Sequence, residues 1–224
     1  MPRTPVPPRS STALHGRPPN VVLIVLDTVR ADHLSSYGYH RRTTPNLDRF
    51  ASRATRYRNA VSSSAWTLPS HASMFTGLAP YQHGAHRTKG RSGAARHRSG
   101  GTKIPRENSL PYDGRHSTLA EALGQAGYTT AAYCANDGYL SRRWGLARGF
   151  QKYVAKRVPA RTLTARALAW IGRQASDVPY FLFLNYMDTH REYSTVPPRP
   201  DIVGYAVEVR STPNLLALRR AVFP

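Results

Sequence analysis

The segment Ala65–Gly77, with the sequence AWTLPSHASMFTG, is the stretch around which the chain is organised. Pro69 suits the first turn of a helix and Ser70 can cap one, so Thr67 is predicted to lie where a helix begins. The N–H groups and the dipole of a helix N-terminus attract anions. A hydroxyl at that position can attack a bound phosphorus or sulfur centre if a metal lowers the pKa of the hydroxyl. The alternative and simpler interpretation is an ordinary capped helix.

A second informative stretch, Val21–Leu26, precedes that helix in the chain and reads VVLIVL. A continuous β-branched and aliphatic run is typical of a central strand that is buried on both faces of a parallel or mixed sheet. Asp27 follows directly, at the carboxyl end of the strand, where α/β folds place their ligands. From its position alone, Asp27 is either a cap for the next turn or a metal ligand.

The rest of the chain alternates helical and strand patterns, which predicts an α/β fold. Further strands are predicted at residues 57–61, 128–133 and 179–186, and helices at residues 43–51, 117–123 and 163–171. Ser117 is predicted to cap the second of these helices, with Glu121 one residue late for a full capping box. In the third helix Leu168 and Ile171 are predicted to face inward.

The composition favours anionic partners. The chain has 224 residues, enough for one domain with a substantial core, and a formal net charge of +20. Such a charge attracts phosphate and sulfate esters or other polyanions, although an Arg-rich solvated surface is the simpler explanation. Nucleic acid is an unlikely partner by this reasoning, because no binding motif is present and aromatic residues do not alternate with the arginines.

The single cysteine and the hydropathy of the chain exclude several classes of site and of membrane segment. Cys134 is the only cysteine, so an internal disulfide and a thiol-rich metal site are excluded, and its apolar neighbours predict a buried strand thiol. No apolar run is long enough to cross a membrane, and the N-terminus lacks the hydrophobic region of a secretory signal. The sequence therefore predicts a cytoplasmic protein.

Proline, glycine and charge patterns divide the chain into regions. Residues 1–19 are predicted to be a disordered Pro/Arg-rich leader, and residues 20–200 an α/β domain. Residues 87–116 are predicted to form a basic loop within that domain, which could steer an anionic substrate. Residues 201–224 are predicted to be an irregular tail.

The segment Thr67–Gly77 resembles the nucleophile motif of the sulfatase family, within the alkaline phosphatase superfamily. In that motif a nucleophile is followed by any residue, then Pro, Ser and Arg, and a small-apolar run that ends in Thr-Gly. This chain departs from it at two positions. Thr67 stands where the family has a Cys or Ser that is oxidised to formylglycine, and His71 stands where the family has Arg. Superfamily relatives that act on phosphodiesters or transfer phospho-groups use an unmodified Thr on a metal.

The resemblance extends over about residues 20–193. The stretches 27–39 and 43–51 look like the family's first metal-ligand strand end and the helix that precedes its nucleophile. After the strand at 128–133, Cys134–Leu140 stands where many sulfatases have a Lys and a His that contact the substrate, so those two residues are absent. Met187–His190 follows a strand that resembles the one leading to a His that contacts the transferred group, and Asp188 could orient that His or stand near the metal.

The resemblance implies an alkaline-phosphatase-like mixed sheet flanked by helices, apparently truncated at the C-terminus because the family's later Asp-His pair is missing. It also implies metal-dependent hydrolysis of sulfuric or phosphoric esters. Thr67 would be the nucleophile and a metal ligand, and Asp27 a second ligand of a divalent ion such as Ca²⁺, Mn²⁺ or Zn²⁺. His190 would bind the anionic ester, and His71 would replace the Arg as an electrostatic or proton-donating partner.

Two other functions stay open from the sequence. Two metal ligands are fewer than hydrolytic sites normally have, so the chain could be a truncated and inactive family remnant. Its arginines could also make it a basic polyanion-binding module. The oligomeric state is not predicted.

Overall fold

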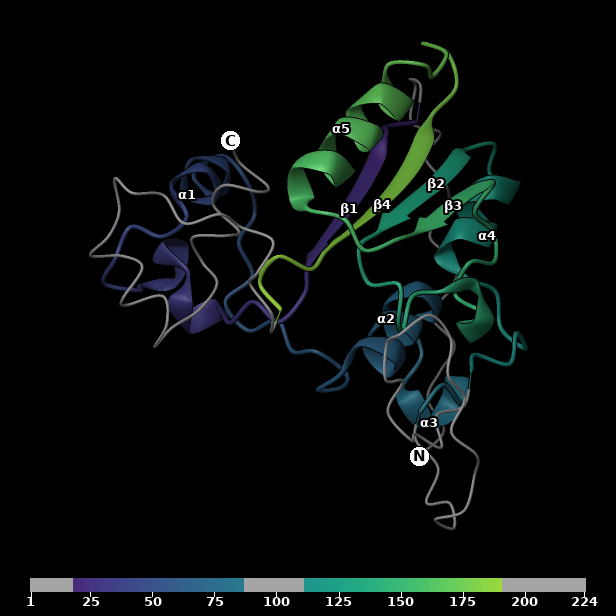
Figure 1. Ribbon diagram of the computed structural model, residues 1–224, viewed down its shortest axis with the longest axis horizontal. Coiled ribbons are helices and arrows are strands. Elements are labelled where there is room, and N and C mark those ends of the chain that lie inside the picture. The colour runs from purple at the N-terminus through teal and green to yellow at the C-terminus, as the bar shows by residue number, and fades with distance from the viewer. Residues whose placement is uncertain (1–17, 87–110, 191–224) are drawn as a thin grey trace, which may run out of the picture.

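The computed structural model describes residues 18–86 and 111–190, and these residues form a parallel sheet with helices on both faces (Figure 1). The strands are β1 (Val21–Leu26), β2 (Thr129–Cys134), β3 (Lys152–Ala155) and β4 (Tyr180–Tyr186). Their order is β1-β4-β2-β3, and each neighbouring pair is parallel. The predicted α/β class and the flanking helices are confirmed, and the described part of the sheet is parallel.

The central strand β4 shows why the sheet is covered on both sides. Its sequence, YFLFLNY, is buried at nearly every position, as is typical of a parallel strand between two helical layers. Phe181 and Phe183 belong to one core cluster, and Leu182 and Leu184 belong to the other. The sheet therefore separates two cores, and Asn185 is placed on the same side as the two phenylalanines.

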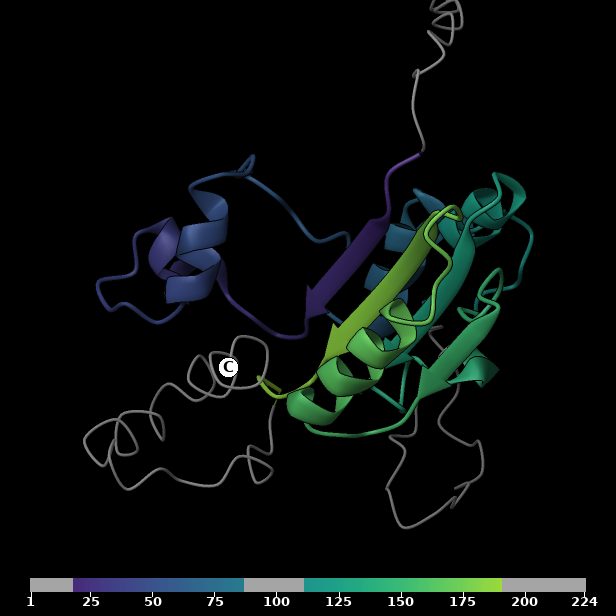
Figure 2. The same cartoon turned by 90° about the horizontal axis from the view of Figure 1, so that it is seen from above.

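Helices of opposite faces fill these two cores. The helices are α1 (Pro45–Ala51), α2 (Thr67–Thr76), α3 (Pro80–His83), α4 (Leu119–Gln125) and α5 (Ala160–Ile171), with short 3₁₀ turns η1 (Ala31–His33), η2 (Ser35–Tyr37) and η3 (Arg142–Trp144). Helix α5 covers one face, and α2 and α4 cover the other (Figure 2). Within the described ranges, no helix is long and apolar enough to cross a membrane.

Strand β1 has the predicted bounds, but its position in the sheet differs from the predicted central one. In the described sheet it lies at an edge, with β4 as its one neighbour, and Val22 and Ile24 are 43% and 48% exposed. The prediction of a central strand buried on both faces was therefore wrong for the described residues. A continuous apolar run identifies a strand, but it does not specify how many neighbours that strand has.

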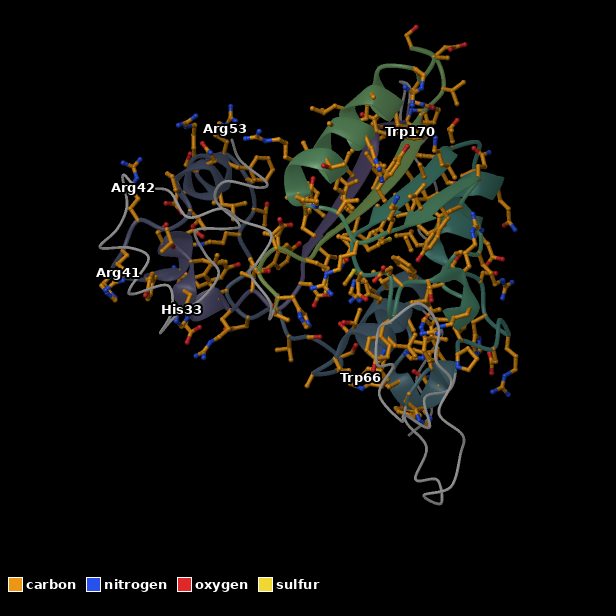
Figure 3. The ribbon with its side chains drawn as sticks, viewed as in Figure 1. His33, Arg41, Arg42, Arg53, Trp66 and Trp170 are labelled. Carbon is orange, nitrogen blue, oxygen red and sulfur yellow. The ribbon has the colours of Figure 1, made fainter. Side chains whose placement is uncertain are left out.

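Helix α1 forms a separate unit with η1 and η2, beyond the carboxyl end of β1 (Figures 1 and 2). The helix predicted at residues 43–51 is present, but none of its residues is fully buried and Phe50 is 62% exposed. A polar contact, Ser35 Oγ to Asp48 Oδ2 at 2.7 Å, ties α1 to η2 instead. Arg41, Arg42 and Arg53 point outward from this unit (Figure 3).

The predicted strand at residues 57–61 is also wrong, because this stretch is irregular and exposed. Strand β3 was not predicted. It is short, and its first residue, Lys152, is exposed, so neither an apolar run nor strict alternation reveals it.

The predicted helices at 117–123 and 163–171 are present, with differences in detail. Thr118 rather than Ser117 caps α4, and its box with Glu121 is complete: Glu121 N–H donates to Thr118 Oγ1 at 3.1 Å, and Thr118 N–H donates to Glu121 Oε2 at 2.8 Å. In α5 the inward side chains include Leu163 and Trp170, whereas Leu168 is exposed. Figure 3 shows Trp170 beside the sheet.

Candidate active site at the carboxyl end of the sheet

Asp27 is fixed at the carboxyl end of β1 by its backbone. Its N–H donates to Tyr186 O at 3.0 Å, which extends the ladder between β1 and β4. The next residue, Thr28, has a φ of +63°, a left-handed conformation that β-branched residues rarely adopt. Thr28 Oγ1 donates to Thr189 O at 2.8 Å, and Thr189 Oγ1 donates to Asp27 O. The turns after β1 and β4 are thus bonded to each other and hold Asp27 in place.

Thr67 is the first residue of α2, as predicted. The residue before it, Trp66, is extended, and its ring contacts Tyr139 edge to face at 5.1 Å between centroids. Figure 3 shows Trp66 beside α2. This contact ties the start of α2 to the loop after β2. The prediction that Ser70 caps the helix is wrong. Its hydroxyl instead contacts Ser62 Oγ at 2.9 Å.

The side chains of Thr67 and Asp27 meet although 40 residues separate them. Thr67 Oγ1 lies 3.5 Å from Asp27 Oδ2, and the hydroxyl can donate its hydrogen to that carboxylate. Thr67 is buried, with 9% of its surface exposed. A helix N-terminus and the carboxyl edge of a parallel sheet therefore converge on one hydroxyl and one carboxylate, which is where α/β folds bind anions and other ligands.

Asn136 is a buried part of this site that the sequence reasoning missed. It lies two residues beyond β2, and its Nδ2 donates to Asp27 Oδ2 at 3.2 Å and to Thr67 Oγ1 at 3.3 Å. Tyr139 N–H donates to its Oδ1 at 3.0 Å, which fixes the orientation of the amide. One signal was available: Asn136 is a polar residue just beyond the carboxyl end of a buried strand, as Asp27 is.

Asn185 and His71 continue the polar contacts behind Thr67. Asn136 N–H donates to Asn185 Oδ1 at 3.2 Å, and Asn185 Nδ2 lies 3.4 Å from His71 Nε2. His71 Nδ1 lies 2.8 Å from Thr67 O, which can only accept, so Nδ1 carries the hydrogen. Asn185 also lacked a prediction, although it interrupts an otherwise apolar strand.

His71 is a neutral ring inside the core. It packs edge to face against Phe75 and Phe183, and burial lowers its pKa, while the bond to Thr67 O and the charge of Asp27 act in the opposite direction. A buried neutral imidazole with both nitrogens engaged cannot supply the positive charge of an arginine. The geometry therefore gives His71 a supporting place behind Thr67.

Asp188 and His190 lie in the turn after β4. Asp188 Oδ1 accepts from Ala160 N–H, the first residue of α5, at 3.0 Å, and burial raises the pKa of the Asp188 carboxyl. Within the described residues, Asp188 Oδ2 is buried without a hydrogen-bond partner. His190 is half-buried, and its N–H donates to Met187 O at 2.9 Å. Asp188 thus contacts a helix end, while the role of His190 stays a prediction.

The Asp27 and Thr67 oxygens fit part of a metal site. Two oxygens that bind one cation at about 2.0–2.6 Å are separated by about 3–3.5 Å, as these are. Carboxylate and hydroxyl donors suit Ca²⁺ or Mn²⁺, whereas Zn²⁺ more often takes nitrogen and sulfur. The described part of the chain brings no group of three or more His, Cys, Asp or Glu side chains together, so these two oxygens are a partial donor set.

Comparison with known proteins identifies the family to which this chain is similar. The family model described as Sulfatase matches residues 19–207. N-acetylgalactosamine-6-sulfatase of Rattus norvegicus is 34% identical over 113 residues, which is 50% of this chain and 20% of that protein. The chain thus matches only about a fifth of the length of this curated relative.

Solved structures share the fold. The structure of BT4656 in complex with its substrate D-glucosamine-2-N,6-O-disulfate has a TM-score of 0.63 at 20% identity, over 85% of this chain and 38% of that one. Phosphonate monoester hydrolase of Agrobacterium radiobacter has a TM-score of 0.62 at 21% identity, over 81% and 43%. The C-terminal periplasmic domain of EcEptC from Escherichia coli, in complex with Zn, has a TM-score of 0.56 at 17% identity, over 82% and 47%.

Proposed function

The chain belongs to the sulfatase family, and from that membership we propose that it hydrolyses sulfuric or phosphoric esters with Thr67 as the nucleophile. The observation that carries the proposal is the distance of 3.5 Å between Thr67 Oγ1 and Asp27 Oδ2, at the N-terminus of α2 and the carboxyl end of the sheet. A hydroxyl beside a carboxylate is the minimal arrangement for an activated oxygen nucleophile.

A divalent cation held by Asp27 and Thr67 would complete the activation. Such an ion lowers the pKa of a bound hydroxyl and offsets the charge of an anionic ester. The chain's own residues accept the hydrogen of the nucleophile and bind the anionic ester. Asp27 Oδ2 is positioned to receive the hydroxyl hydrogen of Thr67, and the N-terminus of α2 attracts the negative group. His190 is proposed to contact the transferred group from the turn after β4.

The covalent change follows from these roles. A bond forms between Thr67 Oγ1 and the sulfur or phosphorus atom, and the bond from that atom to the ester oxygen breaks. The hydrogen that Thr67 gives to Asp27 balances, through solvent, the proton that the ester oxygen takes up as it leaves as the alcohol. A water oxygen then bonds to the sulfur or phosphorus atom and the bond from that atom to Thr67 Oγ1 breaks. Sulfate or phosphate is released and Thr67 Oγ1 takes back a proton. We assign His71 a supporting role, because its buried, neutral ring lies behind the helix backbone rather than beside the hydroxyl.

The substrate class is an anionic ester. Named relatives and structural neighbours include N-acetylgalactosamine-6-sulfatase, a complex with D-glucosamine-2-N,6-O-disulfate and a phosphonate monoester hydrolase, so both sulfur and phosphorus esters are candidates. A net charge of +20 favours either one over a neutral substrate.

The test is turnover of p-nitrophenyl sulfate and p-nitrophenyl phosphate by the full chain with Mn²⁺, Ca²⁺ or Zn²⁺. We expect Thr67→Ala to abolish turnover of the accepted ester. Ser70→Ala is the matched control, because Ser70 lies one turn further along α2 and contacts Ser62, and it should retain activity. A folded wild-type chain that hydrolyses neither ester with any of the metals would contradict the proposal and favour an inactive member of the family.

A further inference from the structure

The buried amide of Asn136 has no part in the roles given above. Its Nδ2 group reaches both Asp27 Oδ2 and Thr67 Oγ1, at 3.2 and 3.3 Å, and its Oδ1 is engaged by Tyr139 N–H. The amide nitrogen therefore faces both oxygens. Because Thr67 Oγ1 accepts from Asn136, the hydrogen of Thr67 is left to point at Asp27.

Asn136 is itself held from behind by a closed circuit of hydrogen bonds. Asn136 N–H donates to Asn185 Oδ1, Asn185 Nδ2 donates to His71 Nε2, and His71 Nδ1 donates to Thr67 O. The circuit closes at Asn136 Nδ2, which donates to Thr67 Oγ1. It connects the loop after β2, strand β4 and helix α2 beside Asp27, which follows β1.

The circuit is buried, and its burial indicates that the polar side chains in it have a defined role. Asn185 is fully buried, and His71 and Asn136 are 3% and 5% exposed. Burying polar side chains costs free energy unless each one is hydrogen-bonded, and an apolar packing of the same volume would avoid that cost. A satisfied circuit of this kind restricts the side chains to one arrangement, and here the only member that also faces Asp27 and the nucleophile is Asn136.

We propose that Asn136 is a positioning residue, which holds the Thr67 hydroxyl in one rotamer with its hydrogen directed at Asp27. The inference rests on the proposed function of Thr67 as nucleophile. Asn185 and His71 act through Asn136 and the backbone of α2, and they do not touch the reacting atoms.

Two variants of Asn136 test the proposal. Asn136→Ala removes the amide. Asn136→Asp keeps the shape and the acceptor for Tyr139 N–H but can no longer donate to Asp27 and Thr67. Asp137→Asn is the matched control, because Asp137 is the next residue and its side chain is exposed. Circular dichroism establishes that each chain is folded.

The first readout is the Thr67 side chain itself. Three-bond couplings to the Thr67 γ-methyl carbon report its χ1 angle, and we expect one staggered rotamer in the wild type and in Asp137→Asn, and averaging in both Asn136 variants. In the wild type we also expect a nuclear Overhauser effect between the Asn136 amide hydrogens and the Thr67 β-hydrogen. A single Thr67 rotamer in a folded Asn136 variant, or the absence of that effect in the wild type, would overturn the proposal.

The second readout is kinetic, with p-nitrophenyl esters and Mn²⁺. Loss of positioning should lower kcat by about 10- to 100-fold and leave KM within about twofold. Averaging of the rotamer without a change in kcat would show that Asn136 shapes the fold and not the reaction. If the wild type has no turnover, the proposed function fails, while the rotamer measurement still decides whether Asn136 positions Thr67.

Discussion

At the scale of single residues, Thr67 is surrounded by groups from four different elements. The hydroxyl faces Asp27 from β1 and Asn136 from the loop after β2, while Asn185 and His71 lie behind it. Asp27, Asn136 and Asn185 lie at or near the carboxyl ends of strands, and His71 lies within α2. The site is therefore precise because the elements that carry it are packed into the two cores.

Asp27 gives the most direct prediction about metal binding. Asp27→Asn removes the carboxylate and should weaken Mn²⁺ binding by more than about 10-fold, since losing even a supporting partner of a ligand costs that much. Asp32→Asn is the matched control: Asp32 lies five residues further on, exposed and paired with Arg30, and the change should leave Mn²⁺ affinity unaltered. Isothermal titration of the full chain measures both. Equal affinities for Asp27→Asn and wild type would exclude Asp27 as a ligand.

Asp188 gives a prediction about pH. Burial raises the pKa of its carboxyl above the ordinary value of about 4. A carboxyl whose pKa is higher in the folded chain stabilises the fold while protonated, and this contribution disappears as the pH rises through the raised pKa. Asp188→Asn keeps an acceptor for Ala160 N–H and cannot ionise, so its stability relative to wild type should increase with pH over that range. Urea unfolding at several pH values checks this, and a constant difference would contradict it.

The residue scale also shows what sequence reasoning can find in such a site. Asp27 and Thr67 stand in recognisable places, after an apolar run and before a Pro-containing helix start, and the structure brings them together. Asn136 carries a weaker signal, because an asparagine two residues beyond a strand is more often a turn residue. Asn185 interrupts an otherwise apolar strand, but that interruption alone does not show what the side chain contacts. Their contacts depend on which strands become neighbours, and that information is not local.

At the scale of elements, α4 offers a clean test of a cap. Thr118 accepts from Glu121 N–H and donates to Arg148 O at 3.1 Å, whereas Ser117 is exposed. Thr118→Ala should destabilise the chain by about 1–2 kcal/mol. The neighbouring Ser117→Ala should change stability by less than about 0.5 kcal/mol. Denaturant unfolding distinguishes them, and the reverse ranking would restore the cap predicted from the sequence.

Two glycines near α4 form a second matched pair. Gly149 has a φ of +80°, and a Cβ there would collide with the backbone of Glu121, whereas Gly127 has a φ of +87° and open space around it. Gly127→Ala should cost about 1–2 kcal/mol for the left-handed backbone alone. Gly149→Ala should cost roughly 3 kcal/mol or more, because the steric overlap adds to that strain. Thermal unfolding measures both, and equal losses would mean that the loop at Gly149 yields freely.

Element predictions succeeded where local pattern and burial agree. Strands β1, β2 and β4 are apolar runs that the fold buries or half-buries, and their positions were predicted within a residue. Strand β3 begins with an exposed lysine and was not predicted. Helix α1 was predicted although none of its residues is fully buried, because its Pro-containing start is a local signal. The edge position of β1 depends on pairing between residues about 160 apart in sequence, which a pattern within one segment cannot express.

At the scale of the whole molecule, charge is the dominant property. A net charge of +20 should draw a dianionic ester toward the site and concentrate it there. For an accepted aryl phosphate, raising the salt concentration from about 50 to about 500 mM should increase KM several-fold with little change in kcat, because salt screens this attraction. Steady-state kinetics at constant Mn²⁺ tests it. A KM that is independent of salt would show that the basic surface does not steer the substrate.

The same whole-molecule view gives Cys134 a practical consequence. Its thiol is buried at the end of β2, in the core that α2 and α4 cover, and burial raises its pKa to about 12. Thiolate is the form that reacts with alkylating reagents, so the native chain should resist maleimides and iodoacetamide. A cysteine introduced at an exposed position could then carry a fluorophore or spin label selectively. Cys134 itself would become alkylated only as the chain opens, and the rate of that reaction would report on the opening.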